Sequence, residues 1–110
     1  MYDAVSLALL VGGKSTRMGE DKAFAPFHNG ILLEWMWQRY SPLFAHAFVV
    51  ARDSTRFHAL GLPVIVDALP EHGSAVGVYT AALAAPTERV ICLACDMPFV
   101  TPQFLRTLAE

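Results

Sequence analysis

Apolar residues gather in four short, nearly continuous runs along the chain, at residues 5–11, 47–51, 64–66 and 89–94. Runs of this length without polar alternation are typical of strands that are covered on both faces, as in a parallel sheet. The first run stops at Gly12 and Gly13, and a polar loop follows it. A turn is indicated by His28-Asn29-Gly30.

Helix signals fall between and after these runs, at residues 31–40, 53–60, 74–84 and 102–109. In 31–40 the apolar residues recur at helical spacing. Gly61 suits the position just past a helix, and Ser74 suits an N-cap. Thr101 and Pro102 suit the N-cap and the first position of the last helix. The chain therefore alternates strands with helices.

Strands that alternate with helices predict an α/β fold: a three-layer α/β/α arrangement around a mostly parallel, Rossmann-like sheet. With right-handed crossovers and a nucleotide-binding order, the four strands are expected in the order 3-2-1-4. Ligands of such sheets bind at the carboxyl ends of the strands, where the order reverses. The features at those ends are the Gly12-Gly13 loop and Asp96. The pattern alone thus brings a glycine loop and a carboxylate into one crevice.

The bulk properties of the chain exclude several classes of protein. A length of 110 residues allows one domain at most, and 55% hydrophobic residues allow a substantial core. The net charge of -2 gives no basic excess for nucleic acid or an anionic membrane. The apolar stretch of residues 4–11 is too short to span a bilayer, and no basic segment precedes it. A cytoplasmic location is expected.

Cys92 and Cys95 form a C-x-x-C pair. Alone, such a pair is compatible with redox chemistry or with half of a zinc site. The four histidines, however, are scattered without paired spacing. Because the pair falls on a predicted strand, an odd separation directs the two side chains to opposite faces. A buried structural role is therefore favoured over redox or zinc chemistry.

The glycine loop has features of a phosphate-binding segment. Glycine lets backbone amides approach phosphate oxygens without a side chain in the way. Arg17 can bind phosphate oxygens in a bidentate manner, and Lys22 supplies a point charge. The loop is not a Walker A motif, because Arg17 stands where that motif needs glycine. Lys14 stands where a dinucleotide fingerprint needs its second glycine.

The motif LLVGGKSTRMGEDKA resembles the opening motif of GT-A-type nucleotidyltransferases, broadly L-[AV]-[AG]-G-x-S-x-R-M-G-x-x-K. Gly12 followed by Gly13, with Asp21 before Lys22, is similar to the molybdenum cofactor guanylyltransferases, the MobA family. The later blocks VIVDALPE, GSAVGV and CLACDMPFVTP match that family in order. The resemblance runs from about residue 5 to 108 and implies the N-terminal half of a nucleotide-diphospho-sugar transferase fold. Residues 1–110 are expected to be the nucleotide-binding part of one nucleotidyltransferase domain.

The resemblance implies a set of nucleotide-binding residues: Leu10, Val11, Gly12, Gly13, Ser15, Lys22, Asp67, Gly73, Gly77 and Asp96. Catalytic roles are implied for Arg17 and Lys22, which counter phosphate charge, and for Asp96. A carboxylate at a strand end suits Mg²⁺, so Asp96 is also the expected metal ligand and Mg²⁺ the expected cofactor. Asp67 is expected to serve the guanine or ribose end.

Three of these residues also have a structural alternative. Lys22 is compatible with a solvated loop lysine, and Asp67 and Asp96 with caps of turns. The family's G-P-L-A-G block reads Gly-Ser-Ala-Val-Gly here, with Ser74 in place of proline. Ala51 stands where family members often have a nucleotide-contacting Asn.

The resemblance implies transfer of GMP from GTP to molybdopterin, with or without molybdenum, giving molybdopterin guanine dinucleotide and pyrophosphate. GTP and the pterin are the expected partners; other proteins of cofactor biosynthesis or molybdoenzyme maturation stay open, and neither nucleic acid nor membrane is expected. One alternative is a related nucleotidyltransferase that uses CTP or a sugar phosphate. The other is a non-catalytic GTP-binding module.

Overall fold

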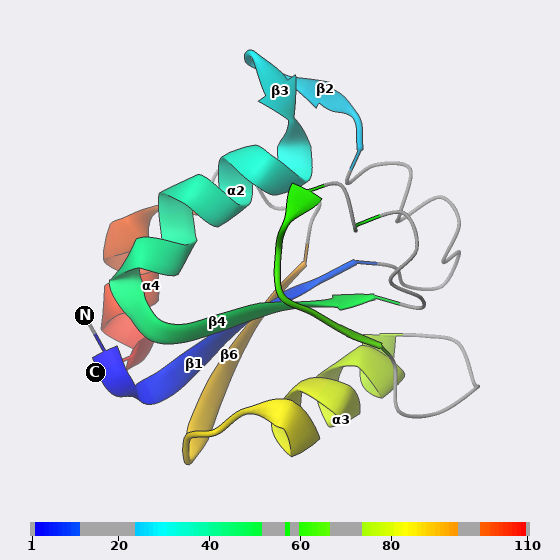
Figure 1. The fold of residues 1–110 in the computed structure, drawn as a ribbon. Coiled ribbons are helices and arrows are strands. Elements are labelled where there is room, and N and C mark those ends of the chain that lie inside the picture. The colour runs from blue at the N-terminus through cyan, green and yellow to red at the C-terminus, as the bar shows by residue number, and fades with distance from the viewer. Residues whose placement is uncertain are drawn as a thin grey trace.

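Four parallel strands form the central sheet of the computed structural model, which describes residues 2–11, 24–51, 57, 60–66, 74–94 and 100–109. The strands are β1 (Tyr2–Leu10), β4 (Phe44–Ala51), β5 (Val64–Val66) and β6 (Arg89–Ala94). Their order across the sheet is β5-β4-β1-β6, and every pairing is parallel (Figure 1). In chain order this is 3-2-1-4, so the predicted topology is confirmed. The order reverses between β1 and β6.

Helices cover both faces of this sheet, which gives the predicted three layers. The helices are α2 (Leu32–Tyr40), α3 (Ser74–Ala84) and α4 (Pro102–Ala109). Figure 1 shows α2 and α4 on one face and α3 on the other. The bounds of α4, β5 and β6 agree with those predicted from the sequence, and α2 begins one residue later than expected. α3 begins at Ser74, the residue that was predicted to be its N-cap.

The alternating side chains of β1 explain why its whole run is apolar. Leu7 and Leu9 face one layer and pack in the core that includes α2 and α4. Ala8 and Leu10 face the other layer and pack with Ala81 of α3. Because successive side chains of a strand point to opposite faces, a strand between two helical layers is apolar at nearly every position. The exception in this run is the buried Ser6.

A two-stranded hairpin precedes α2. It consists of β2 (Pro26–Phe27) and β3 (Gly30–Ile31), paired antiparallel. The predicted turn over residues 28–30 is confirmed, and His28 has a φ of 54°, in the left-handed region. The two strands themselves were not predicted, because two residues are too few to show an alternating pattern.

Two strands begin earlier than the apolar runs suggest. β1 begins at Tyr2 rather than Val5, and β4 begins at Phe44 rather than Ala47, directly after a short 3-10 helix at Ser41–Leu43. Tyr2 pairs with Phe44, and the register of the ladder shifts between Tyr2 and Ser6. There the side chains at 45 and 46 are exposed, and hydrophobicity no longer marks the strand.

The predicted short helix at 53–60 lies mostly outside the described residues. Gly61, which was predicted to lie just past its end, has a φ of 68°. Glycine adopts this left-handed conformation without the steric cost that a Cβ imposes.

Side-chain hydrogen bonds hold the start of β6. The buried Ser6 hydroxyl lies 2.7 Å from the Thr87 hydroxyl, and Thr87 donates to the carbonyl of Arg89 at 2.6 Å. The Arg89 guanidinium donates to the carbonyl of Ala109 at 3.0 Å. A cation at a helix C-terminus satisfies a free carbonyl and complements the helix dipole. The end of α4 is thereby tied to the start of its preceding strand.

Candidate active site

The carboxyl ends of the four strands lie level with one another. Leu10 pairs with Val50 on one side and with Ala94 on the other, and Val50 pairs with Ile65. Val11 continues the edge, since its amide donates to the carbonyl of Val50 at 2.8 Å. The chain therefore leaves all four strands on the same side of the sheet, at their carboxyl ends.

Most of the sequence-predicted site residues follow these strand ends along the chain. Three of them, Leu10, Val11 and Gly77, belong to the described residues. The others lie outside that part of the chain: Gly12, Gly13, Ser15, Arg17, Lys22, Asp67, Gly73 and Asp96. Their roles stay predictions. The structure places only the positions from which their segments depart: the ends of β1, β5 and β6, and the start of α3.

Leu10 and Gly77 meet where α3 packs against the end of β1. Gly77 is buried, and a Cβ added to it would lie 3.6 Å from Cδ2 and 3.7 Å from Cδ1 of Leu10. These are ordinary van der Waals distances. The first turns of α3 thus lie directly against the strand end that leads into the glycine loop, and two of the predicted nucleotide-binding residues are neighbours.

Gly77 allows its structural and binding roles to be separated. A Cβ fits against Leu10, and alanine is a better helix former than glycine. Gly77→Ala is therefore expected to raise the free energy of unfolding, measured by urea titration, by about 0.5–1 kcal/mol. If its backbone also approaches the nucleotide, the same variant binds GTP more weakly.

The reverse substitution at an exposed site in α3, Ala82→Gly, is the matched control for Gly77→Ala. We expect it to lose stability by a similar amount and to bind GTP as the unaltered chain does. GTP affinity that is unchanged in Gly77→Ala would assign Gly77 to packing alone.

Two side-chain contacts hold Val100 and Thr101, the described residues that precede α4. The Tyr40 hydroxyl donates to the carbonyl of Val100, and the Thr101 hydroxyl accepts the Phe104 amide at 3.1 Å. The second contact confirms Thr101 as the N-cap of α4. The first was not predicted, because nothing in a single sequence relates residues 60 positions apart.

The described cysteine supports a structural role. Cys92 is half-buried on the face of β6 that packs toward α3. Burial raises the pKa of its thiol, so the unreactive neutral form is favoured. Cys95 lies outside the described residues, so the predicted opposite facing of the pair stays a prediction. Among the residues that are described, no three His, Cys, Asp or Glu side chains gather as metal ligands.

Within the described ranges, no helix is long and apolar enough to cross a membrane.

Ala51, at the end of β4, is fully buried in the core on the α2 side of the sheet. Its methyl group offers no hydrogen-bond donor or acceptor at this strand end.

Comparison with known proteins agrees with this geometry. The model of the MobA-like NTP transferase domain matches residues 7–110. A protein of Carboxydothermus hydrogenoformans named "Probable molybdenum cofactor guanylyltransferase" is 35% identical over 106 residues, which cover 96% of this chain and 53% of that protein. The chain spans about half the length of the curated relatives it matches.

Solved structures show the same fold. A crystal structure of an Aquifex aeolicus protein has a TM-score of 0.75 at 27% identity and covers 96% of this chain and 57% of its own. The structure of molybdopterin-guanine dinucleotide biosynthesis protein A from Archaeoglobus fulgidus has a TM-score of 0.68 at 30% identity, covering 94% and 53%. The family model matches residues 7–110, and the strand order agrees with the fold of these solved structures. The chain therefore belongs to the family of MobA-like NTP transferase domains.

Proposed function

We propose that this chain is the GTP-binding part of a molybdenum cofactor guanylyltransferase, which transfers GMP from GTP to the phosphate of molybdopterin. The observation that carries the proposal is the level pairing of Leu10 with Ala94 at the point where the strand order reverses. Ligands of open α/β sheets bind at this point. The segments that contain Gly12 and Asp96 both begin there.

The proposed phosphate site consists of backbone amides and two cations. The amides of Gly12 and Gly13, with Ser15, approach the triphosphate. Arg17 and Lys22 neutralise its charge and that of the leaving pyrophosphate. Nucleotide contacts by Leu10, Val11 and Gly77 would be made at the described edge where β1 meets α3.

The remaining contacts are assigned to the other strand ends. Asp67, directly after β5, is proposed to bind the guanine or the ribose, and Gly73 precedes α3. Nucleotidyltransferases of this family generally use a divalent metal ion. Mg²⁺ prefers one or two carboxylates together with substrate phosphates and water, and a single Asp96 fits that requirement. The ion would supply charge neutralisation on the nucleotide.

The proposed reaction is an in-line displacement at the α-phosphorus of GTP. A phosphate oxygen of the pterin forms the new bond to this atom. The bond from it to the oxygen that bridges to the β-phosphate breaks, and pyrophosphate leaves with that electron pair. Such transfers depend on positioning and charge neutralisation more than on covalent catalysis. The residues of the chain thus hold the nucleotide in line and counter its charge.

Nucleotide preference tests the proposal. Melting temperature is measured with GTP, CTP and UTP, each with Mg²⁺. A ligand at one hundred times its Kd stabilises a protein by about 2.7 kcal/mol, which at this chain length raises the melting temperature by about 10 °C or more. We expect this rise with GTP and a clearly smaller one with the pyrimidine nucleotides. A preference for CTP would contradict guanylyl transfer and favour a cytidylyl relative.

Transfer itself is tested separately from GTP binding. Purified chain, GTP and molybdopterin are incubated with Mg²⁺, and the dinucleotide and pyrophosphate are measured. GTP binding without either product would favour a nucleotide-binding module for these 110 residues. The assignment of residues 1–110 to one nucleotidyltransferase domain, the protein partners beyond the substrates and the cytoplasmic location stay predictions.

A further inference from the structure

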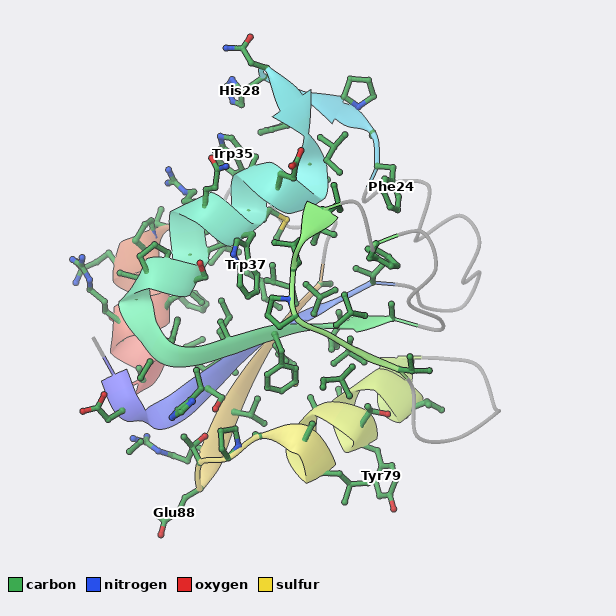
Figure 2. All side chains as sticks on the ribbon, in the orientation of Figure 1. Phe24, His28, Trp35, Trp37, Tyr79 and Glu88 are labelled. Carbon is green, nitrogen blue, oxygen red and sulfur yellow. The ribbon has the colours of Figure 1, made fainter. Side chains whose placement is uncertain are left out.

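A cleft of about 440 Å³ lies between the hairpin β2–β3 and the first two turns of α2. Glu34, Trp35 and Gln38 line it from α2, and residues 27–30 of the hairpin line its other side. Its volume is within the range of small-ligand sites, about 300–1,000 Å³. Figure 2 shows His28 and Trp35 at this end of the molecule. The cleft uses none of the residues that are proposed to bind GTP.

The aromatic wall of the cleft is held in place by its own contacts. The Trp35 indole stacks with the His28 imidazole, with ring centroids 5.5 Å apart and ring planes 21° apart. The Phe27 ring meets the indole edge-on, at 4.8 Å between centroids. The Arg39 guanidinium carbon lies 5.1 Å from the indole centroid, although Arg39 does not line the cleft. Rings that are already packed lose little freedom when a ligand binds, and this indole already accepts a guanidinium group.

His28 keeps its ring in this wall in spite of an unfavourable backbone conformation. Its φ of 54° is the one positive φ at a non-glycine residue in the part of the chain that the structure describes. Such a conformation is uncommon outside glycine, and a residue held in it at a cavity is a candidate binding residue. The turn thus places the imidazole against Trp35 at the expense of an unstrained backbone.

The charge of the cleft limits what it can bind. Among the described residues that line it, Glu34 is the one carboxylate, and there is no lysine or arginine. Glu34 is half-buried, and its Oε1 lies 3.5 Å from the point where a Cβ of Gly30 would stand. The φ of Gly30 is not positive, so the backbone does not require glycine there. Its missing side chain leaves the approach to the carboxylate open.

We propose that the cleft binds a guanidinium group, carried either by an arginine side chain of a partner protein or by a small free cation. A planar guanidinium packs flat on an aromatic ring and donates two parallel hydrogen bonds to a carboxylate, here Glu34. The exposed amides of Asn29 and Gln38 can accept further N–H groups. An ammonium group has no such planar fork, so lysine should bind more weakly. The inference does not depend on the proposed function.

The two tryptophans of the chain allow the site to be observed directly. In proton–nitrogen NMR spectra the indole N–H groups of Trp35 and Trp37 give separate signals, and Trp37 packs against the core and does not line the cleft. N-acetyl-arginine amide is titrated as the peptide-borne probe and methylguanidinium as the free cation. We expect a saturable shift of the Trp35 signal at millimolar concentrations, with the Trp37 signal unchanged.

N-acetyl-lysine amide is the matched control probe, and we expect it to bind at least several-fold more weakly. The absence of a saturable Trp35 shift with both guanidinium probes would overturn the proposal. Equal affinity for the lysine probe would overturn it as well, because the site would then recognise positive charge alone.

Glu34→Gln keeps the size of the side chain and removes its charge. We expect guanidinium affinity to fall about two- to fivefold, the range of exposed ion pairs. Glu88→Gln makes the same change in net charge at an exposed glutamate, which Figure 2 shows at the opposite end of the molecule. It should leave the affinity unchanged. An equal fall in the two variants would reduce the binding to non-specific attraction and overturn the site.

His28→Asn removes the imidazole and keeps the turn, because asparagine tolerates a positive φ. Urea unfolding checks that the variant is folded. We expect guanidinium affinity to fall several-fold, since part of the aromatic wall is lost. Unchanged affinity in the folded variant would overturn the assignment of this wall to guanidinium binding.

Comparison of the two guanidinium probes identifies the source of the ligand. Tighter binding of N-acetyl-arginine amide would assign the site to an arginine of a partner protein, and equal binding would assign it to a small cation. Both results support a guanidinium site. Because neither probe is a nucleotide, the measurement stands whether or not the chain binds GTP.

Discussion

Asp96→Asn is expected to remove most of the gain in GTP affinity that Mg²⁺ provides, by at least about tenfold, since even residues that only orient metal ligands cost that much. The substitution keeps the shape of the side chain and removes the negative charge that a hard cation requires. Titration calorimetry with GTP, with Mg²⁺ and in EDTA, measures the effect. In EDTA the variant should bind GTP at least as well as the unaltered chain, because one negative charge near the phosphates is lost.

Asp3→Asn provides the control for this charge change. Asp3 is exposed near the start of β1, at the opposite edge of the sheet from the proposed site. The net charge of the chain changes equally in the two variants, so long-range electrostatic effects should be similar. Only Asp96→Asn should alter the response to Mg²⁺. If the two variants respond alike, Asp96 has the capping role that the sequence left open.

Leu7→Ala is expected to lower the free energy of unfolding by about 3 kcal/mol, a large part of the stability of a domain of this size. Leu7 is fully buried on the central strand, where it is paired with Ala47 and Ile91 and packs on the α2 and α4 side. Removal of its isobutyl group leaves a cavity that rigid neighbours on both strands cannot fill. Urea unfolding followed by circular dichroism measures the loss.

The matched control is Leu83→Ala in α3, whose side chain is 63% exposed. The same atoms are removed, but little apolar surface returns to water and no cavity forms. We expect a change of no more than about 0.5 kcal/mol. A loss at Leu83 as large as that at Leu7 would mean that the outer face of α3 is covered in solution.

The topology was predictable from the sequence because strands between two helical layers must be apolar throughout. The runs at 64–66 and 89–94 became strands with the predicted bounds, and Gly61 and Thr101 marked the limits of elements as expected. Parallel pairing then follows from the intervening helices, and the handedness of the crossovers leaves few orders to consider. The sequence therefore predicted that the carboxyl ends of β1 and β6 lie next to each other.

Features that do not depend on hydrophobicity were missed. The beginnings of β1 and β4 contain exposed side chains at 3, 4, 45 and 46, which interrupt the apolar runs there. The hairpin before α2 is too short to show a period. The bond from Tyr40 to Val100 depends on where two helices pack in space, and no local pattern encodes it.

The candidate site was predictable in part, for a similar reason. Leu10, Val11 and Gly77 lie where expected because they belong to a strand end and a helix whose positions follow from the fold. The roles of Gly12, Arg17, Lys22 and Asp96 depend on loop conformation and on a ligand. They rest on the resemblance of their motif.

The central place of β1 has a consequence for how the chain folds. β1 is synthesised first, β4 is available to it after the hairpin and α2, and β6 becomes available only near the end of the described chain. Contacts between residues so far apart require closure of a large loop, which slows folding. Until β6 is synthesised, the backbone N–H and C=O groups on that side of β1 are unpaired and can pair with strands of other chains. The strand that organises the sheet is therefore also the one most exposed to aggregation during synthesis.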